Sequence, residues 1–168
     1  MLGKTEFKLL FDTYFDAIRS FVFYRCGDAN VASDVAQEVF MKVWEKREQW
    51  DGDNLKPLLY KMASDMLVNT IRKTASRNDF ETNMILEDQS ALSPEEEMLH
   101  KELTSQYARA LEEMPEMQRI VFLMSRNDEL KYHEIAERLE IGIKAVEKRM
   151  SAALKFLKTE MLSIGNET

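Results

Sequence analysis

The 168-residue sequence has few of the residues that mark several protein classes. Its one cysteine, Cys26, excludes an internal disulfide and a cysteine-rich metal site. Only 5 glycines and 3 prolines are present, too few for the many turns of a β-sandwich or barrel. No run of about 18 apolar residues occurs, and the N-terminus lacks the apolar core of a signal peptide, so we expect a cytoplasmic protein.

Signals of catalysis are also missing. The two histidines, His100 and His133, are far apart in the sequence, and no glycine-rich phosphate loop or nucleophile elbow occurs. We interpret the neighbouring pair His133 and Glu134 as solvated surface rather than as a metal ligand or an acid–base pair. We therefore expect no enzyme, no metal, no cofactor and no small-molecule substrate.

Charge is abundant but unevenly distributed. The chain has 23 basic and 30 acidic residues, a net charge of −7, which taken alone argues against binding to nucleic acid. Residues 75–100, however, hold 1 basic and 7 acidic residues, whereas residues 1–74 hold 11 of each. We expect a flexible acidic linker over residues 75–92, which either mimics nucleic acid, or suppresses non-specific DNA binding by the free protein, or is only a solvated tether.

The remaining sequence predicts an all-α fold of two small helical bundles, residues 1–74 and 93–168, because helix-forming Leu, Met, Ala, Glu and Lys dominate. In the first bundle, an amphipathic helix should end at Gly27-Asp28. A second helix is expected over about residues 30–48, and a third from the N-cap Asn54 to Lys73, with Pro57 in its first turn. The apolar stripe of the first helix is Phe7, Leu10, Phe11, Tyr14, Phe15, Ile18, Phe21 and Val22.

The second bundle begins with the capping sequence Ser93-Pro94-Glu95-Glu96. Helices are expected to about residue 113, then over residues 115–126, 132–139 and 143–161. The last two have the spacing of a helix-turn-helix, and a local net charge of +4 over residues 143–158 favours DNA binding over an ordinary helical hairpin. The expected apolar seam is Ile135, Ala136, Leu139, Ile141, Val146, Met150 and Leu154.

Several segments together resemble the small, extracytoplasmic-function (ECF) group of bacterial RNA polymerase sigma factors of the sigma-70 family. In the N-terminal half they are residues 34–44 (DVAQEVFMKVW) and 59–63 (LYKMA). In the C-terminal half they are residues 110–122 (ALEEMPEMQRIVF), 134–139 (EIAERL) and 145–149 (AVEKR). The resemblance covers nearly the whole chain, and the order and separation of these segments make it specific.

The resemblance implies three binding surfaces. The second helix would dock on core RNA polymerase, although without the family match its charges are better explained by pairs on a solvated face. The third helix, with net charge +3, and the loop before it would capture the melted minus-10 promoter element; Trp50 is equally well a core or lid residue. The helix-turn-helix would read the minus-35 element as duplex.

The residues assigned to these surfaces are as follows. Polymerase binding is assigned to Asp34, Gln37, Glu38, Phe40, Lys42 and Trp44. Minus-10 binding is assigned to Trp50, Asp53, Asn54, Lys56, Lys61, Asp65, Asn69, Arg72 and Lys73. Minus-35 binding is assigned to Lys131, Tyr132, Lys144, Ala145, Lys148 and Arg149.

Five positions depart from the family pattern, among them Ala145, which replaces a usual threonine and gives up a hydroxyl contact. Leu58 stands where Trp is common and Asp65 where Asn is common, and both bear on promoter specificity. In the helix-turn-helix, Glu140 takes a position that favours a left-handed glycine or asparagine, and Gly142 replaces the usual serine cap; these changes are compatible with the motif.

The family also implies an anti-sigma partner, often membrane-bound. The leading interpretation is a sigma factor that binds core polymerase, directs it to promoters and assists melting. The alternatives are a stand-alone helix-turn-helix regulator with an N-terminal effector or dimerisation domain, and a helical adaptor that does not bind DNA. The eleven methionines, Met41, Met62 and Met66 among them, are expected mainly to fill the core.

Overall fold

The computed structural model describes residues 1–50, 54–73 and 93–164. Every regular element in these ranges is helical, as the composition predicted. The expected linker at residues 75–92 and the candidate DNA contact Asp53 lie outside the described residues. No helix in the described ranges is long and apolar enough to cross a lipid bilayer.

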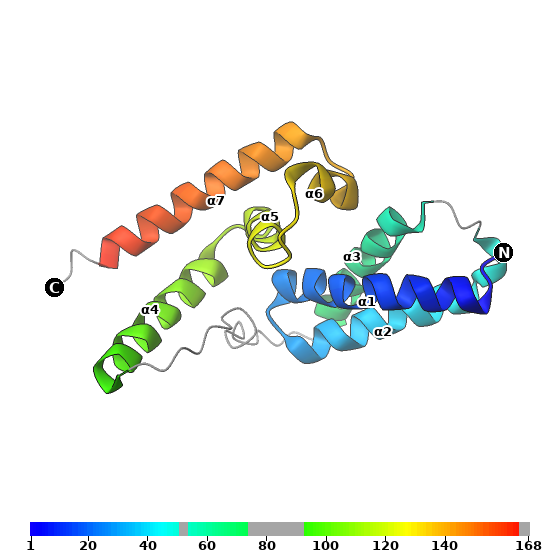
Figure 1. The fold of residues 1–168 in the computed structure, drawn as a ribbon, viewed down its shortest axis with the longest axis horizontal. Helices are drawn as coiled ribbons and strands as arrows, with labels where there is room; N and C mark the ends of the chain where they lie inside the picture. Colours follow the sequence, from blue (N-terminus) through cyan, green and yellow to red (C-terminus); the bar gives the residue numbers. More distant parts are fainter. Residues whose placement is uncertain (51–53, 74–92, 165–168) are drawn as a thin grey trace.

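The N-terminal bundle contains α1 (Lys4–Cys26), α2 (Ala29–Glu45), a 3₁₀ turn η1 (Arg47–Gln49) and α3 (Leu55–Lys73) (Figure 1). Gly27 ends α1 in the left-handed conformation at φ 69°, and Asp28 caps α2 by accepting hydrogen bonds from the Asn30 and Val31 amides. Helix α2 ends at Glu45, earlier than predicted, because the chain tightens into η1. Asn54 precedes α3 with φ 72°, a left-handed rather than an extended cap conformation.

The C-terminal bundle contains α4 (Pro94–Glu113), α5 (Glu116–Arg126), α6 (Tyr132–Leu139) and α7 (Ile143–Ile164). The predicted capping box is present: the Ser93 amide donates to Glu96 Oε2 at 2.8 Å and the Glu96 amide donates to Ser93 Oγ at 3.3 Å. Glu95, Glu96 and Glu97 therefore belong to the first turn of α4, where acids suit the positive end of the helix dipole. Part of the acidic stretch is thus helical cap rather than linker.

The helix-turn-helix packs largely as predicted. Ile135, Ala136, Val146 and Met150 are buried, and Glu140 takes the left-handed conformation, with φ 52° and ψ 45°. The prediction for Leu154 was wrong, because this side chain is 53% exposed. The seam continues instead through Ala153 and Leu157, which follow Met150 at spacings of three and four and so lie on the same side of α7.

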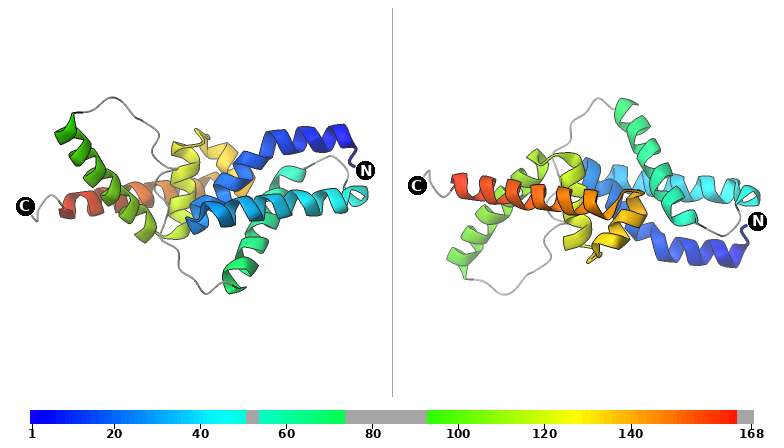
Figure 2. Two further views of the ribbon diagram at one scale, coloured as in Figure 1. Left: turned by 90° about the horizontal axis from the view of Figure 1, so that it is seen from below. Right: turned by 90° about the horizontal axis from the view of Figure 1, so that it is seen from above.

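The two bundles pack directly against each other. The C-terminal end of α1 lies against α5, and α3 lies against α6 (Figure 2). The buried apolar residues consequently form one continuous cluster that runs from Leu2 in the N-terminal bundle to Leu157 in the C-terminal one. The sequence predicted two bundles without placing one relative to the other, and the structure joins them through this cluster.

Candidate protein and nucleic-acid interfaces

The expected polymerase-binding residues lie along the outer side of α2. Asp34, Gln37 and Glu38 are exposed, and Lys42 pairs with Glu38 at 3.1 Å, Nζ to Oε1. Glu38 and Lys42 are the (i, i+4) pair that a solvated helix face would also show, and such a pair contributes only a few tenths of a kcal/mol, about 0.3–0.5. This face is therefore available for binding rather than needed for stability.

The edge of the Phe40 ring was expected on the exposed docking face, but the structure buries it. The side chain is only 2% exposed, because three phenylalanine rings of α1 cover it at centroid distances of 5.1–6.3 Å. Those rings are Phe7, Phe11 and Phe15. Phe40 thus supports the face from beneath, and Trp44 is held at its end between the Phe7 ring and the Arg47 guanidinium.

An apolar groove beside this face was not anticipated. It has a volume of about 540 Å³ between the N-terminal half of α1 and α2. Met41, which was expected in the core, is 61% exposed at its rim. A sequence signal existed: Met41 follows Gln37 by four positions and so shares its outward face. The groove is lined by Lys4, Phe7, Phe11, Gln37, Phe40, Met41 and Trp44.

The expected minus-10 residues form a stripe on α3. Lys61, Asp65, Asn69 and Arg72 are all exposed and recur at spacings of four, four and three, which places them on one side of the helix; Lys73, also exposed, follows Arg72. Beneath them, Leu59, Ala63 and Leu67 are fully buried and fix the helix on the bundle. The stripe offers cations for a nucleic-acid backbone and two polar side chains for bases.

The start of the expected minus-10 surface is arranged differently. Trp50 packs partly buried against the core, and its Nε1 has no hydrogen-bond partner among the described residues. Asn54 is exposed. Lys56 is already engaged across the domain boundary, where its Nζ lies 3.3 Å from Glu137 Oε1 on α6. The structure therefore does not place Lys56 at a free surface.

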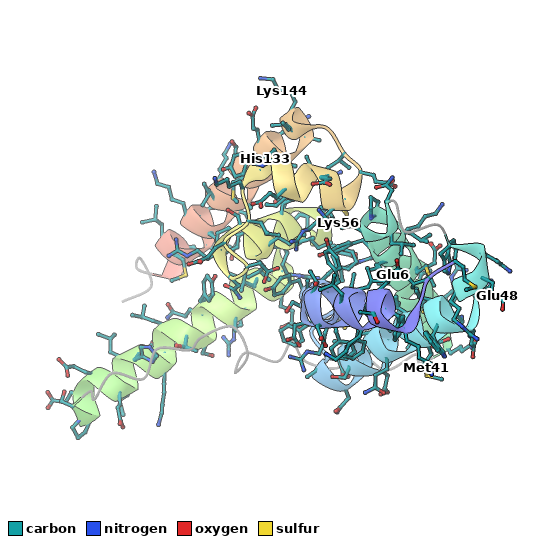
Figure 3. The ribbon with its side chains drawn as sticks, turned by 45° about the vertical axis from the view of Figure 1, so that its right-hand side comes forward. Glu6, Met41, Glu48, Lys56, His133 and Lys144 are labelled. Atoms are coloured by element: carbon teal, nitrogen blue, oxygen red, sulfur yellow. The ribbon has the colours of Figure 1, made fainter. Side chains whose placement is uncertain are left out.

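The expected minus-35 residues surround the start of α7 and of α6. Lys144 projects into solvent from the first turn of α7. In Figure 3 it lies at the top of the view, whereas Met41 lies towards the bottom. Lys131, Tyr132 and Lys148 are exposed, Ala145 is half-buried, and Arg149 is turned inward far enough to bury its Nη1 without a partner among the described residues. The first turn of α7 has no acid of its own, and its exposed Lys144 pairs with Glu147 at 3.6 Å, Nζ to Oε2.

His133 and Glu134 have no catalytic arrangement. His133 is exposed, and Glu134 caps α6 by accepting a hydrogen bond from the Lys131 amide at 2.7 Å, which lowers the pKa of its carboxyl group. No group of three or more potential metal ligands occurs within the part of the chain that the structure describes.

Comparison with known proteins accounts for both halves of the chain. Sigma-70 region 2 matches residues 10–77, and sigma-70 region 4 matches residues 104–157. The ECF RNA polymerase sigma factor SigW of Bacillus subtilis is 23% identical over 94% of this chain and 90% of its own length. The ferric citrate uptake sigma factor FecI of Escherichia coli is 26% identical over 91% of this chain and 89% of its own.

Solved structures show the same fold. The sigma factor RpoE of Bartonella quintana, crystallised with the anti-sigma factor NepR, is similar at a TM-score of 0.60 and 20% identity, over 93% of this chain and 96% of that one. CnrH, in complex with the cytosolic domain of CnrY, is similar at a TM-score of 0.63 and 17% identity, over 96% and 90%. With both sigma regions present in order over full-length relatives, this chain belongs to the ECF group of the sigma-70 family of RNA polymerase sigma factors.

Proposed function

We propose that this sigma factor divides its work among the three surfaces described above. The outer face of α2 docks on core RNA polymerase, the stripe on α3 holds the melted minus-10 element, and the helix-turn-helix binds the minus-35 duplex. Because its partners are polymerase and chromosomal DNA, the protein works in the cytoplasm. The observation that carries the proposal is the separation of these polar surfaces onto different helices, each held on a packed apolar base.

The α2 face suits a protein partner. Asp34, Gln37 and Glu38 contribute polar groups beside an apolar groove that contains Met41 and Trp44. Interfaces between proteins combine an apolar centre, enriched in aromatic residues and methionine, with a polar rim. Reversal of charge by Glu38→Lys should therefore weaken binding to core polymerase, whereas Glu102→Lys, the same reversal at an exposed position on α4, should not.

The helix-turn-helix suits duplex DNA. Its buried seam fixes the first turn of α7, where Lys144 and Lys148 are exposed as phosphate contacts. Acidic substitution there by Lys148→Glu should weaken promoter-directed transcription at least tenfold. Lys101→Glu, the same change of charge on α4, should leave it within about twofold because that position is remote from the seam.

The deciding experiment is run-off transcription by purified core polymerase on a fragmented genomic template. Transcripts with defined starts should appear only when this protein is added, and footprints on those promoters should require polymerase. A defined footprint by the protein alone would favour a stand-alone regulator. Unaltered function of Lys148→Glu would favour an adaptor that does not bind DNA.

An anti-sigma partner is part of the same proposal. The two solved relatives are described as complexes with NepR and with the cytosolic domain of CnrY, of which NepR is named an anti-sigma factor. In this chain the apolar groove between α1 and α2 would accept an apolar helix of such a regulator, because it adjoins the face that polymerase needs. Competition between that regulator and core polymerase would test this assignment.

A further inference from the structure

The end of the C-terminal bundle that lies away from the N-terminal bundle contains an apolar groove between α4, α5 and α7 (Figure 1). Helix α4 is buried in its C-terminal half, at Ala108, Ala110 and Leu111, whereas residues 93–103 are exposed throughout. Towards its N-terminal end α4 diverges from α7, and the groove opens between them (Figures 1 and 2). The groove has a volume of about 530 Å³, and its apolar lining is Tyr107, Phe122, Leu154, Leu157 and Met161.

Apolar side chains continue along both walls of the groove into solvent. On α4, Leu99 and Leu103 precede Tyr107 at spacings of four and so share its side of the helix, yet they are 58% and 46% exposed. On α7, Leu154 and Met161 are seven positions apart and both line the groove. A contiguous exposed apolar patch on a soluble protein marks a surface that binds another macromolecule. The two strips are therefore placed to receive helices from a partner.

The two walls carry opposite charge. Residues 94–103 of α4 contain four acidic residues and one lysine, a net charge of −3. Residues 151–159 of α7 contain two lysines and no acidic residue, a net charge of +2, and one of these lysines, the exposed Lys158, lines the groove. An acidic apolar strip and a basic apolar strip are complementary, but within one chain they cannot meet because the two helices diverge.

We propose that the groove is occupied by a second copy of this chain, in a two-fold dimer in which α4 of each copy packs on α7 of the other. A two-fold axis makes each contact twice, so both strips of both copies are covered at once. Leu99 and Leu103 of one copy meet Leu154 of the other, and the acidic end of α4 lies beside Lys158. The four helices then enclose a shared apolar centre, as in a four-helix bundle.

A second copy fits this surface better than a single foreign helix does. A foreign helix would need an acidic edge for α7 and a basic edge for α4, whereas a second copy provides both strips from surfaces already present. The dimer is a form of the free protein, and it is independent of the roles proposed for α2, α3 and the helix-turn-helix. Its strips are short, so we expect a weak association, with a Kd of about 10 µM.

Sedimentation velocity of the full chain, over about 1 to 100 µM protein at low salt, tests the dimer. The wild-type protein should shift from monomer to dimer as its concentration rises. Leu103→Glu should weaken the association at least tenfold, because it places an acid within the apolar contact. The matched control Leu9→Glu makes the same change at a more exposed leucine of α1 and should remain within twofold of wild type.

Charge is tested in the same assay. Lys158→Glu should weaken the association at least tenfold, because it sets an acid beside the acidic end of α4. Raising the salt concentration to about 0.5 M should weaken the wild-type dimer, since salt screens exposed charges. Equal association in low and high salt would contradict the pairing of an acidic strip with a basic one.

Cross-linking tests which helices meet. In a Cys26→Ser background, Leu103→Cys and Leu154→Cys chains with different tags are mixed, so that each chain has a single cysteine and every cross-link joins two copies. A short bis-maleimide should join a Leu103→Cys chain to a Leu154→Cys chain. A predominance of cross-links between two Leu103→Cys chains would show that α4 pairs with α4 and would overturn the proposed arrangement.

Three further results would overturn the proposal. They are a wild-type protein that stays monomeric to about 100 µM, equal association of Leu103→Glu and Leu9→Glu, and a monomeric protein in which Leu103→Glu instead abolishes binding to core polymerase. The last result would assign the groove to polymerase. Circular dichroism checks that each variant is folded, and if Leu103→Glu is not, Lys158→Glu and the cross-links decide the question.

Discussion

Replacement of Arg119 by methionine should lower the free energy of unfolding by about 3 kcal/mol. The guanidinium makes its two shortest hydrogen bonds, 2.7 and 2.8 Å, to the Tyr24 and Arg25 carbonyls at the end of α1. Its Nη1 also reaches the Leu111 and Glu112 carbonyls near the end of α4, at 3.2 and 3.3 Å. A buried acceptor left without its donor costs about 1–3 kcal/mol, so two such carbonyls cost roughly 2–6 kcal/mol. Methionine recovers part of this because the desolvation of a buried cation is no longer required.

Urea denaturation followed by circular dichroism measures the effect. With a slope of about 2 kcal/mol per molar urea, the Arg119→Met midpoint should fall by about 1.5 M. Arg119→Lys should also be destabilised, because a single ammonium group cannot span carbonyls at the ends of two helices. Arg126→Met, at an exposed position on the same helix, is the control and should remain within about 0.5 kcal/mol of wild type. An Arg119→Met midpoint no lower than that of the control would refute the view that this cation holds the two helix ends.

Three other substitutions test separate features. Phe40→Ala should destabilise the protein by about 3–5 kcal/mol in the same urea assay, because the ring is buried beneath the α1 phenylalanines; a loss below about 1 kcal/mol would mean that the ring is not part of the core. Glu140→Gly should raise the free energy of unfolding by about 1 kcal/mol, because glycine removes the strain at φ 52°. The thermal midpoint should rise accordingly, and a lower midpoint would contradict this. Burial raises the pKa of the Asp128 carboxyl group, so the folded state binds the proton more tightly and stability falls as pH rises from about 4 through that raised pKa. Asp128→Asn, which keeps an acceptor for Tyr24, should flatten this pH dependence relative to wild type, and identical curves for the two proteins would show that Asp128 is not the group responsible.

Local chemistry explains why most helix ends were predictable. The capping box at Ser93, the left-handed Gly27 and the turn at Glu140 each depend on residues within a few positions of one another. The stripe on α3 was likewise predictable, since its spacing follows directly from the helical period. Features that arise within one helix or one turn are therefore readable from the sequence.

Features that depend on contacts between distant segments could not be predicted from the sequence. Tyr24, near the end of α1, is buried and donates its hydroxyl hydrogen bond to Asp128, which lies 104 positions away in the chain. Arg119 resembles any cation on an amphipathic helix until the end of α1 is placed beside it. Phe40 and Met41 are adjacent apolar residues, and only the packing of α1 on α2 decides which is buried and which is exposed. The contact between the two bundles could not be derived because nothing in either half alone specifies it.

The shared cap at Arg119 also limits how freely the halves of such proteins can be exchanged. A chimera that joins residues 1–73 of this chain to the C-terminal half of a relative would retain the α1 carbonyls of Tyr24 and Arg25. It would gain a donor for them only if the incoming α5 presented a guanidinium at the same place. Where that donor is missing, the chimera should fold as two independent domains. The contact between the two halves is thus specific to this pair of sequences, because it depends on one guanidinium from α5 and two carbonyls from α1.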